Sequence, residues 1–333
     1  MPIRWDFKEH LSLGKYVLRW FFLVLPMAAL VGSAVALFLW MLHEATVLRW
    51  EHPWLVYLLP LAGIVIVVSY ARYGKNAEGG NNLVMEQIHQ PGGGVPLRMA
   101  PLVLLGTVTT HLFGGSAGRE GTAVQMGGSI AQVFTRPLKL DESDTRILLT
   151  AWGCGGFGAV FGTPDRGGLC PGGAGPGSMR YNALLPCLMA SIMGDFFCTV
   201  WDRSHPLPHQ RGGPADFAAE LRIDPLLALK IAIASVAFGL AGFLFAELTH
   251  SFQKLFKRFV PVYWMRPIIG AVLVLGISWL LGTRDYLGIG VTTASGEGVS
   301  IVNAFTGGVT AWSWFWKLLL TAITLSAGFK GAR

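Results

Sequence analysis

The sequence predicts an all-α protein that crosses a membrane several times. Of its 333 residues, 52% are apolar and only 14% carry a charge, and the mean hydropathy is +0.50. This composition is too apolar for a soluble domain of the same length. Apolar stretches recur along the chain, some near the ~20 residues that a helix needs to span a bilayer and some shorter. This mixture argues against a β-barrel and against a single-span anchor.

The helices are predicted in order by six apolar stretches: Tyr16–Leu42, Trp54–Tyr70, Pro101–Leu112, Leu226–Leu248, Arg266–Leu281 and Ser313–Ala327. The first is longer than the core of a signal peptide, and no small-residue cleavage site follows it, so we expect a retained helix. Arg4, Lys8 and Lys15 precede it, and Arg19 lies in its first turn. By the positive-inside rule, these residues predict a cytoplasmic N-terminus for a multi-pass protein of the cell (inner) membrane.

The remaining charge and cysteine patterns exclude other classes of protein. The net charge of +7 arises from 26 Lys and Arg against 19 Asp and Glu, and basic residues gather beside apolar segments. Positive-inside bias explains this better than nucleic-acid binding does. Four cysteines form neither a CxxC motif nor a His-spaced pattern. We therefore predict no disulfide framework, no metal and no cofactor.

Two weak internal repeats predict two structural halves. Ser116–Gly121 recurs as Ser326–Gly331 with an offset of 326 − 116 = 210, and Gly80–Val84 is echoed by Gly288–Thr292 with an offset of 288 − 80 = 208. Duplicated halves with short, glycine-interrupted helices are typical of transporters whose site lies near the membrane midplane. We predict a first transmembrane half at 1–201, a polar linker at 202–224, and a second transmembrane half at 225–333.

The glycine-rich segment Gly114–Ser129 contains the strongest candidate site. Arg119 and Glu120 lie in it between apolar stretches, and charges inside a membrane are usually functional. A glycine bend that opens a helix points backbone N–H groups forward and forms an anion site. Glu120 could occupy that site with its carboxylate or leave it when protonated. The alternative is a structural role, either pairing with Arg119 or capping the helix. No nucleotide-binding loop motif is present.

Gly118-Arg119-Glu120-Gly121-Thr122, followed by Ala123–Gly127, resembles the signature of the CLC family of chloride channels and proton-coupled anion antiporters. Phe157–Pro164 and the Gly80-Asn81-Asn82 loop are also similar to that family. The resemblance implies an inverted-repeat fold, a homodimer with one pathway per protomer, and Glu120 as the gating and proton-carrying glutamate. It implies an anion site made by Gly80, Asn81, Asn82, Gly118, Arg119, Gly121 and Thr122.

Two departures from the usual pattern resemble the fluoride-exporting branch of the family. Thr122 replaces a proline, and Asn81 replaces a serine of the first anion loop. Fluoride is small and tightly hydrated, so its site needs compact donors such as the Asn81 amide. The alternative is that Asn81 or Asn82 only caps a short helix at Leu83–His89. Fluoride and chloride both remain open as substrates at this point.

The sequence also breaks the family pattern. After Pro164 the family continues with an apolar helix, whereas residues 165–177 are rich in Gly and Pro. If this stretch is back-translated into DNA and read one base later, it encodes an apolar sequence. We therefore interpret it as a local frameshift. A genuine glycine-rich re-entrant loop is the alternative. The second half also appears incomplete, because the family's second anion loop would follow Gly331. We expect such a truncated chain to fold poorly and not to transport.

The predicted function is CLC-type halide transport, with fluoride/proton antiport preferred over an uncoupled chloride channel. The predicted partners are a halide ion, protons, the lipid bilayer and a second copy of the chain. Rival functions of another class are a non-functional structural fragment and an intramembrane enzyme that uses Glu120 as its acid or base. No HExxH, GxSxG or paired intramembrane aspartates accompany Glu120, so we predict that the chain is not an enzyme.

Overall fold

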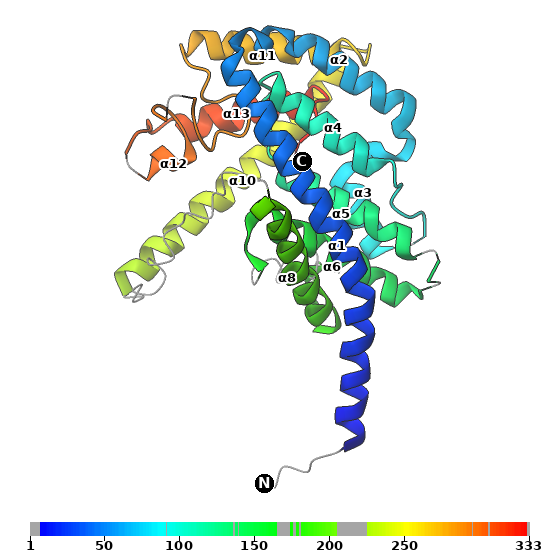
Figure 1. The fold of residues 1–333 in the computed structure, drawn as a ribbon. Helices are drawn as coiled ribbons and strands as arrows, with labels where there is room; N and C mark the ends of the chain where they lie inside the picture. Colours follow the sequence, from blue (N-terminus) through cyan, green and yellow to red (C-terminus); the bar gives the residue numbers. More distant parts are fainter. Residues whose placement is uncertain are drawn as a thin grey trace.

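The computed structural model describes residues 7–90, 92–135, 137–138, 140–164, 174–175, 178–179, 181–204, 225–294, 296–305 and 307–331. Most of the suspected frameshift segment at 165–177, the predicted linker from residue 205 onward, and residues 332–333 lie outside this part of the chain. The described part is almost wholly helical (Figure 1). Two-residue strands, β1 (Ala174–Gly175) and β2 (Ser178–Met179), form one antiparallel pair.

The predicted apolar stretches coincide with helices, with at most one residue beyond a helix end, and further helices lie between them. Up to residue 204 they are α1 (Phe7–Glu51), the 3-10 helix η1 (Pro53–Leu58), α2 (Leu59–Ser69), the π-helix η2 (Tyr70–Gly74), the 3-10 helix η3 (Lys75–Gly79), α3 (Gly80–His89), α4 (Met99–Leu112), α5 (Glu120–Thr135), α6 (Glu142–Phe161) and α8 (Tyr181–Ser204). From residue 225 onward they are α10 (Pro225–Phe259), α11 (Arg266–Leu280), α12 (Ile301–Ala304) and α13 (Ser313–Ser326).

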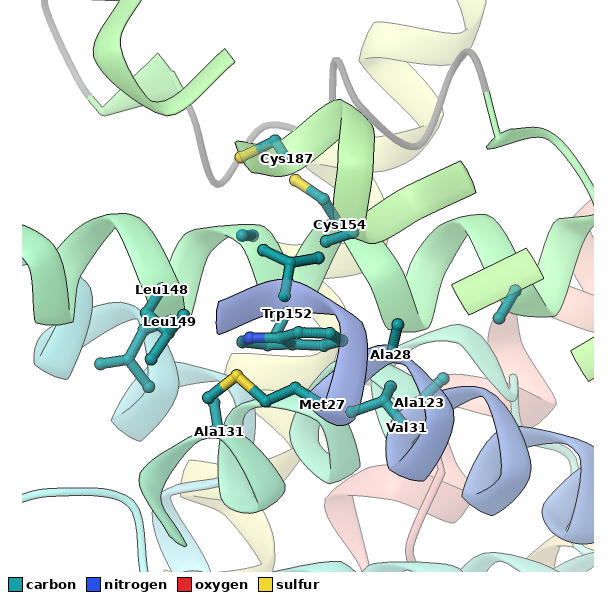
Figure 2. Packing of buried hydrophobic residues seen from close by; sticks show 14 of the residues in the cluster. Met27, Ala28, Val31, Ala123, Ala131, Leu148, Leu149, Trp152, Cys154 and Cys187 are labelled. Carbon is teal, nitrogen blue, oxygen red and sulfur yellow. The ribbon is translucent and has the colours of Figure 1, made fainter. Parts of the chain in front are cut away.

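One apolar core joins α1, α5, α6 and α8. Trp152 of α6 is fully buried in this core, with Met27 of α1 and Ala131 of α5 on the same side of its ring (Figure 2). Gly156 allows α5 to approach, since a Cβ at this glycine would lie 2.6 Å from the carbonyl oxygen of Ala123. Small residues at such contacts let membrane helices pack closely. This core therefore fixes the position of α5.

A second apolar core joins segments that are distant in the sequence. Leu59 and Ile66 of α2 pack with Ala271 and Val274 of α11 and with Leu320 of α13. Figure 1 shows α2, α11 and α13 together at the same end of the molecule. The region of α2 is thus held by helices that follow residue 265.

Four helices in the described residues are long and apolar enough to cross a membrane: Leu11–Glu51, Pro53–His89, Asn182–Trp201 and Pro225–Phe259. Met99–Leu112 and Arg266–Leu280 are shorter apolar helices. The predicted all-α, polytopic fold is confirmed. The most apolar window of α10 contains no buried residue, and Figure 1 shows this helix extending away from the rest of the protein.

Candidate functional site

A buried turn connects α4 to α5 and sets where α5 begins. Residues 113–119, here called the glycine turn, form no helix, and Gly114 adopts a φ of +84°, which L side chains rarely adopt. The backbone N–H of Gly115 donates to the Thr110 carbonyl at 2.7 Å, which closes the turn onto the end of α4. The predicted glycine bend that opens a helix is therefore present, and α5 begins inside the protein.

Glu120 is the first residue of α5, and its carboxylate turns back onto the helix start. Its Oε2 atom accepts a hydrogen bond from the backbone N–H of Arg119 at 3.1 Å. Arg119 and Glu120 are both half-buried, whereas Gly121 and Thr122 are buried. The start of a helix carries unpaired N–H groups and a partial positive charge. A carboxylate is therefore held where an external anion could also bind.

His111 holds the glycine turn against α4. Its Nδ1 atom lies 2.8 Å from the Thr107 carbonyl oxygen, and its Nε2 atom lies 3.0 Å from the Ala117 carbonyl oxygen. The ring is completely buried. A neutral imidazole has a single N–H and can donate to only one of these carbonyls at a time. His111 was not among the predicted site residues.

The two copies of the Ser-Ala-Gly repeat lie against each other. The hydroxyl groups of Ser116 and Thr321 are 2.9 Å apart, although 205 residues separate them. A Cβ added to Gly331 would lie 2.5 Å from the Ala117 Cβ and 3.1 Å from the Gly118 carbonyl oxygen, so glycine is needed for this approach. The repeat from the second half therefore forms one wall of the glycine turn. The sequence offset identified the repeat but gave no indication of this direct contact.

The first predicted anion loop lies beside α5. Gly80 begins α3 with a φ of +56°, and a Cβ at this position would lie 3.5 Å from Nε2 of Gln125 on α5. Asn81 is half-buried, whereas Asn82 is exposed. The α3 helix begins at Gly80, earlier than the predicted Leu83, and Gly79 is at its N-cap with no side-chain capping bond. The structure therefore places the backbone of Gly80 near α5 and leaves Asn82 facing outward.

The Thr122 side chain on α5 contacts α4. Its hydroxyl lies 2.8 Å from the hydroxyl of Thr107, and both side chains are fully buried. A proline at position 122 could not make this contact, because proline has no hydroxyl group. The unusual threonine thus has a definite partner in the structure.

Lys330 brings a positive charge close to the site. Its Nζ atom lies 3.8 Å from the centroid of the Tyr70 ring, and its backbone N–H donates to Thr110 Oγ1 at 3.3 Å. Residue-level reasoning missed both Lys330 and Tyr70. A usable signal was present, because the repeat aligns Lys330 with Glu120 at the offset of 210. The two halves therefore place opposite charges at equivalent repeat positions.

Comparison with known proteins identifies the family. The family profile described as voltage gated chloride channel matches residues 62–332. A chloride/fluoride channel protein of Pseudomonas syringae pv. tomato is 41% identical over 325 residues, which cover 97% of this chain and 70% of that protein. The chain belongs to the voltage-gated chloride channel (CLC) family.

Other CLC relatives show the same fold. The crystal structure of a CLC-type fluoride/proton antiporter aligns with a TM-score of 0.81 and 29% identity, over 94% of this chain and 76% of that chain. The structure of a slow cyanobacterial Cl⁻/H⁺ antiporter aligns with a TM-score of 0.68 at 18% identity and supports the fold alone. The H⁺/Cl⁻ exchange transporter ClcA of Salmonella paratyphi A is 22% identical, and this CLC chain spans about half (48%) of its length.

Proposed function

We propose that this CLC chain carries halide ions across a membrane and exchanges fluoride for protons. The observation that carries this proposal is the Glu120 carboxylate bound to the backbone N–H of Arg119 at the start of α5. Family membership and the similarity to a CLC-type fluoride/proton antiporter support the proposal. Transport without enzymatic chemistry is part of the same proposal.

The geometry suggests how the Glu120 carboxylate and a halide ion compete for one binding site. As a carboxylate, Glu120 is attracted to the N–H groups and the positive dipole at the start of α5. When it takes up a proton, its negative charge is lost and the attraction weakens. A halide ion then replaces the carboxylate at the same N–H groups, and loss of the proton reverses the exchange. Each cycle therefore links the movement of an anion to the movement of a proton.

The predicted anion site includes Gly80, Asn81 and Asn82 together with Gly118, Arg119, Gly121 and Thr122. The approach of Gly80 to Gln125 supports the placement of the α3 start near α5. Asn81 is half-buried on the first turn of α3 and offers an amide donor of the kind that fluoride requires. We propose fluoride over chloride on this ground and assign Asn82, which is exposed, a smaller role.

The decisive experiment measures proton movement driven by fluoride. The purified 333-residue chain is reconstituted into liposomes with a fluoride gradient, and the internal pH and external fluoride are followed together. We expect fluoride flux coupled to proton flux in the opposite direction; such flux would contradict the expectation, drawn from the sequence, that this chain does not transport. In Glu120→Gln the coupling should be lost, because the amide cannot release or accept a proton under these conditions. Glu51→Gln is the matched control, since Glu51 is exposed at the end of α1.

Each other outcome points to a rival function. Fluoride or chloride flux without proton movement in the wild-type chain would favour an uncoupled channel. No flux above that of protein-free liposomes would favour the non-transporting structural fragment. Coupled flux that persists in Glu120→Gln would remove this residue from the mechanism.

The proposal extends to the protein's location and assembly. We propose an inner-membrane protein with a cytoplasmic N-terminus, supported by the basic residues before the first span. We also propose a homodimer in which each protomer has its own pathway. Exposed apolar side chains such as Phe238 and Phe243 on α10 are available to lipid or to a second copy. Reporter fusions at the N-terminus and cross-linking in native membranes test these two points.

A further inference from the structure

A pocket of about 190 Å³ lies where α1 ends, beside the loop that follows α11. We call it the Arg49 pocket; Arg49, Arg284, Asp285, Thr292 and Thr293 are among the residues that line it. It shares no lining residue with the predicted Glu120 site. The pocket is therefore a separate feature of the molecule.

Arg49 is a buried cation without an acidic partner in the described part of the chain. Its exposure is 8%, and its Nη1 atom donates to the His111 carbonyl oxygen at 3.3 Å. The ion pairs found among the described residues are Arg19 with Asp144 and Arg146 with Glu142, and neither includes Arg49. Buried charges are normally paired, because leaving water is costly for an ion. A guanidinium also has five N–H donors, so one carbonyl leaves most of them unused.

The groups around Arg49 add further positive charge. The Nζ atom of Lys317 donates to the carbonyl oxygens of Tyr286 at 3.0 Å and of Gly288 at 2.5 Å. A Cβ added to Gly288 would lie 2.9 Å from Arg49 Nη2, so the Gly288 backbone lies between the two cations. In the described part of the chain, the Lys317 ammonium group donates to backbone carbonyls and forms no ion pair with a carboxylate.

Among the described residues, the other charged groups that line the pocket form no ion pair with Arg49 because they have contacts of their own. The Oδ2 atom of Asp285 accepts a hydrogen bond from the Val299 backbone N–H at 2.9 Å, which holds this carboxylate on its own loop. Arg284 donates to the Pro53 carbonyl at 3.0 Å and lies over the Tyr57 ring. The pocket lining therefore carries two arginines against one carboxylate, which keeps its negative charge but is held by the Val299 N–H.

We propose that the Arg49 pocket binds a small monovalent inorganic anion of the halide type. Arg49 supplies the charge-assisted donors, and Thr292 and Thr293 also line the pocket. The site has a physical link to the glycine turn, because the His111 carbonyl that accepts from Arg49 also accepts from the Gly114 N–H at 3.1 Å. An anion at Arg49 is thus held next to the turn that leads to Glu120.

The test measures binding and does not depend on transport. Bromide is titrated calorimetrically into detergent-purified protein in gluconate buffer, with the wild type, Arg49→Gln and Arg72→Gln compared. We expect Arg49→Gln to weaken bromide binding about tenfold or more, because a charge-assisted donor is lost. Arg72 is exposed on η2, and its change should leave binding as in the wild type. Equal bromide affinity in the wild type and Arg49→Gln would overturn the proposal.

Two further measurements separate this site from the proposed transport. The Arg49-dependent part of bromide binding should persist in Glu120→Gln, whether or not the chain moves fluoride. Bromide-soaked crystals of the wild type should show an anomalous peak beside the Arg49 guanidinium, which also covers the case in which Arg49→Gln does not fold. An anomalous peak at the start of α5 with none beside Arg49 would contradict the proposal.

Discussion

The ammonium group of Lys330 lies over the face of the Tyr70 ring, 3.8 Å from its centroid. Tyr70 is 4% exposed and begins the π-helix after α2, whereas Lys330 follows α13 by four residues. A cation over an aromatic face in a desolvated site contributes about 2 kcal/mol. The contact ties the second copy of the repeat to the segment that precedes the first anion loop.

Replacing either member of this pair should reduce stability. We expect Lys330→Met and Tyr70→Leu each to lower the free energy of unfolding by about 1–2 kcal/mol, with the double variant losing less than the sum. Tyr70→Phe is the matched control, because it keeps the ring and removes a buried hydroxyl that has no hydrogen-bond partner in the described structure. Thermal unfolding in detergent measures these changes. Additive losses would show that the two side chains do not interact.

The Thr107–Thr122 hydroxyl pair should also show coupling. Thr122→Val leaves the buried Thr107 hydroxyl without this partner, and such a change costs about 1–3 kcal/mol. Thr107→Val should cost a similar amount. The double variant Thr107→Val/Thr122→Val should be less destabilised than the sum, because neither hydroxyl is then left unpaired. A double-mutant cycle on thermal unfolding would refute the pairing if the coupling energy were zero.

Close packing of α5 on α6 should make Gly156 intolerant of a side chain. Gly156→Ala places a Cβ 2.6 Å from the Ala123 carbonyl oxygen, a distance at which the helices must move apart. We expect a loss of about 1–3 kcal/mol from overpacking. Gly239→Ala is the matched control, because nothing lies within 4 Å of a Cβ there on α10. That change should leave the melting temperature equal or slightly higher, since alanine favours helix.

Asn81 should contribute to anion preference. Asn81→Ser replaces the amide with a shorter donor and should lower the preference for fluoride over chloride by about tenfold, the effect of one charge-assisted hydrogen bond. Anion-exchange flux in liposomes with each halide measures the ratio. Asn76→Ser serves as the comparison, since Asn76 is exposed on η3. An unchanged ratio in Asn81→Ser would leave this residue with a structural role only.

The sequence pattern predicted the helices better than it predicted their limits. Four of the six apolar stretches lie within helical segments and two end one residue beyond them, but α1 begins at Phe7, whereas the apolar stretch began at Tyr16. Hydropathy detects only the apolar part of a helix. The helix itself can continue into the polar residues on either side. The stretch Trp54–Tyr70 becomes η1, α2 and the start of η2, because an apolar run does not distinguish α from 3-10 or π geometry.

The candidate site was predicted in part. The glycine bend and the placement of Glu120 at a helix start followed from local sequence, because glycine and helix polarity act over a few residues. The partners Thr321, Tyr70 and Lys330 were not predicted. Hydropathy and periodicity show which face of a segment is apolar, but they do not specify which distant segment packs against it. The long-range contacts of the glycine turn therefore required the three-dimensional arrangement.

The contact between Ser116 and Thr321 has a consequence for biogenesis. The ribosome must add 205 further residues after Ser116 before its partner exists. Helices α4 and α5 therefore leave the translocon with one side of their connecting turn still uncovered. Membrane insertion therefore precedes completion of the ion pathway. Any chaperone that shields the partly synthesised protein acts in the interval between the two events.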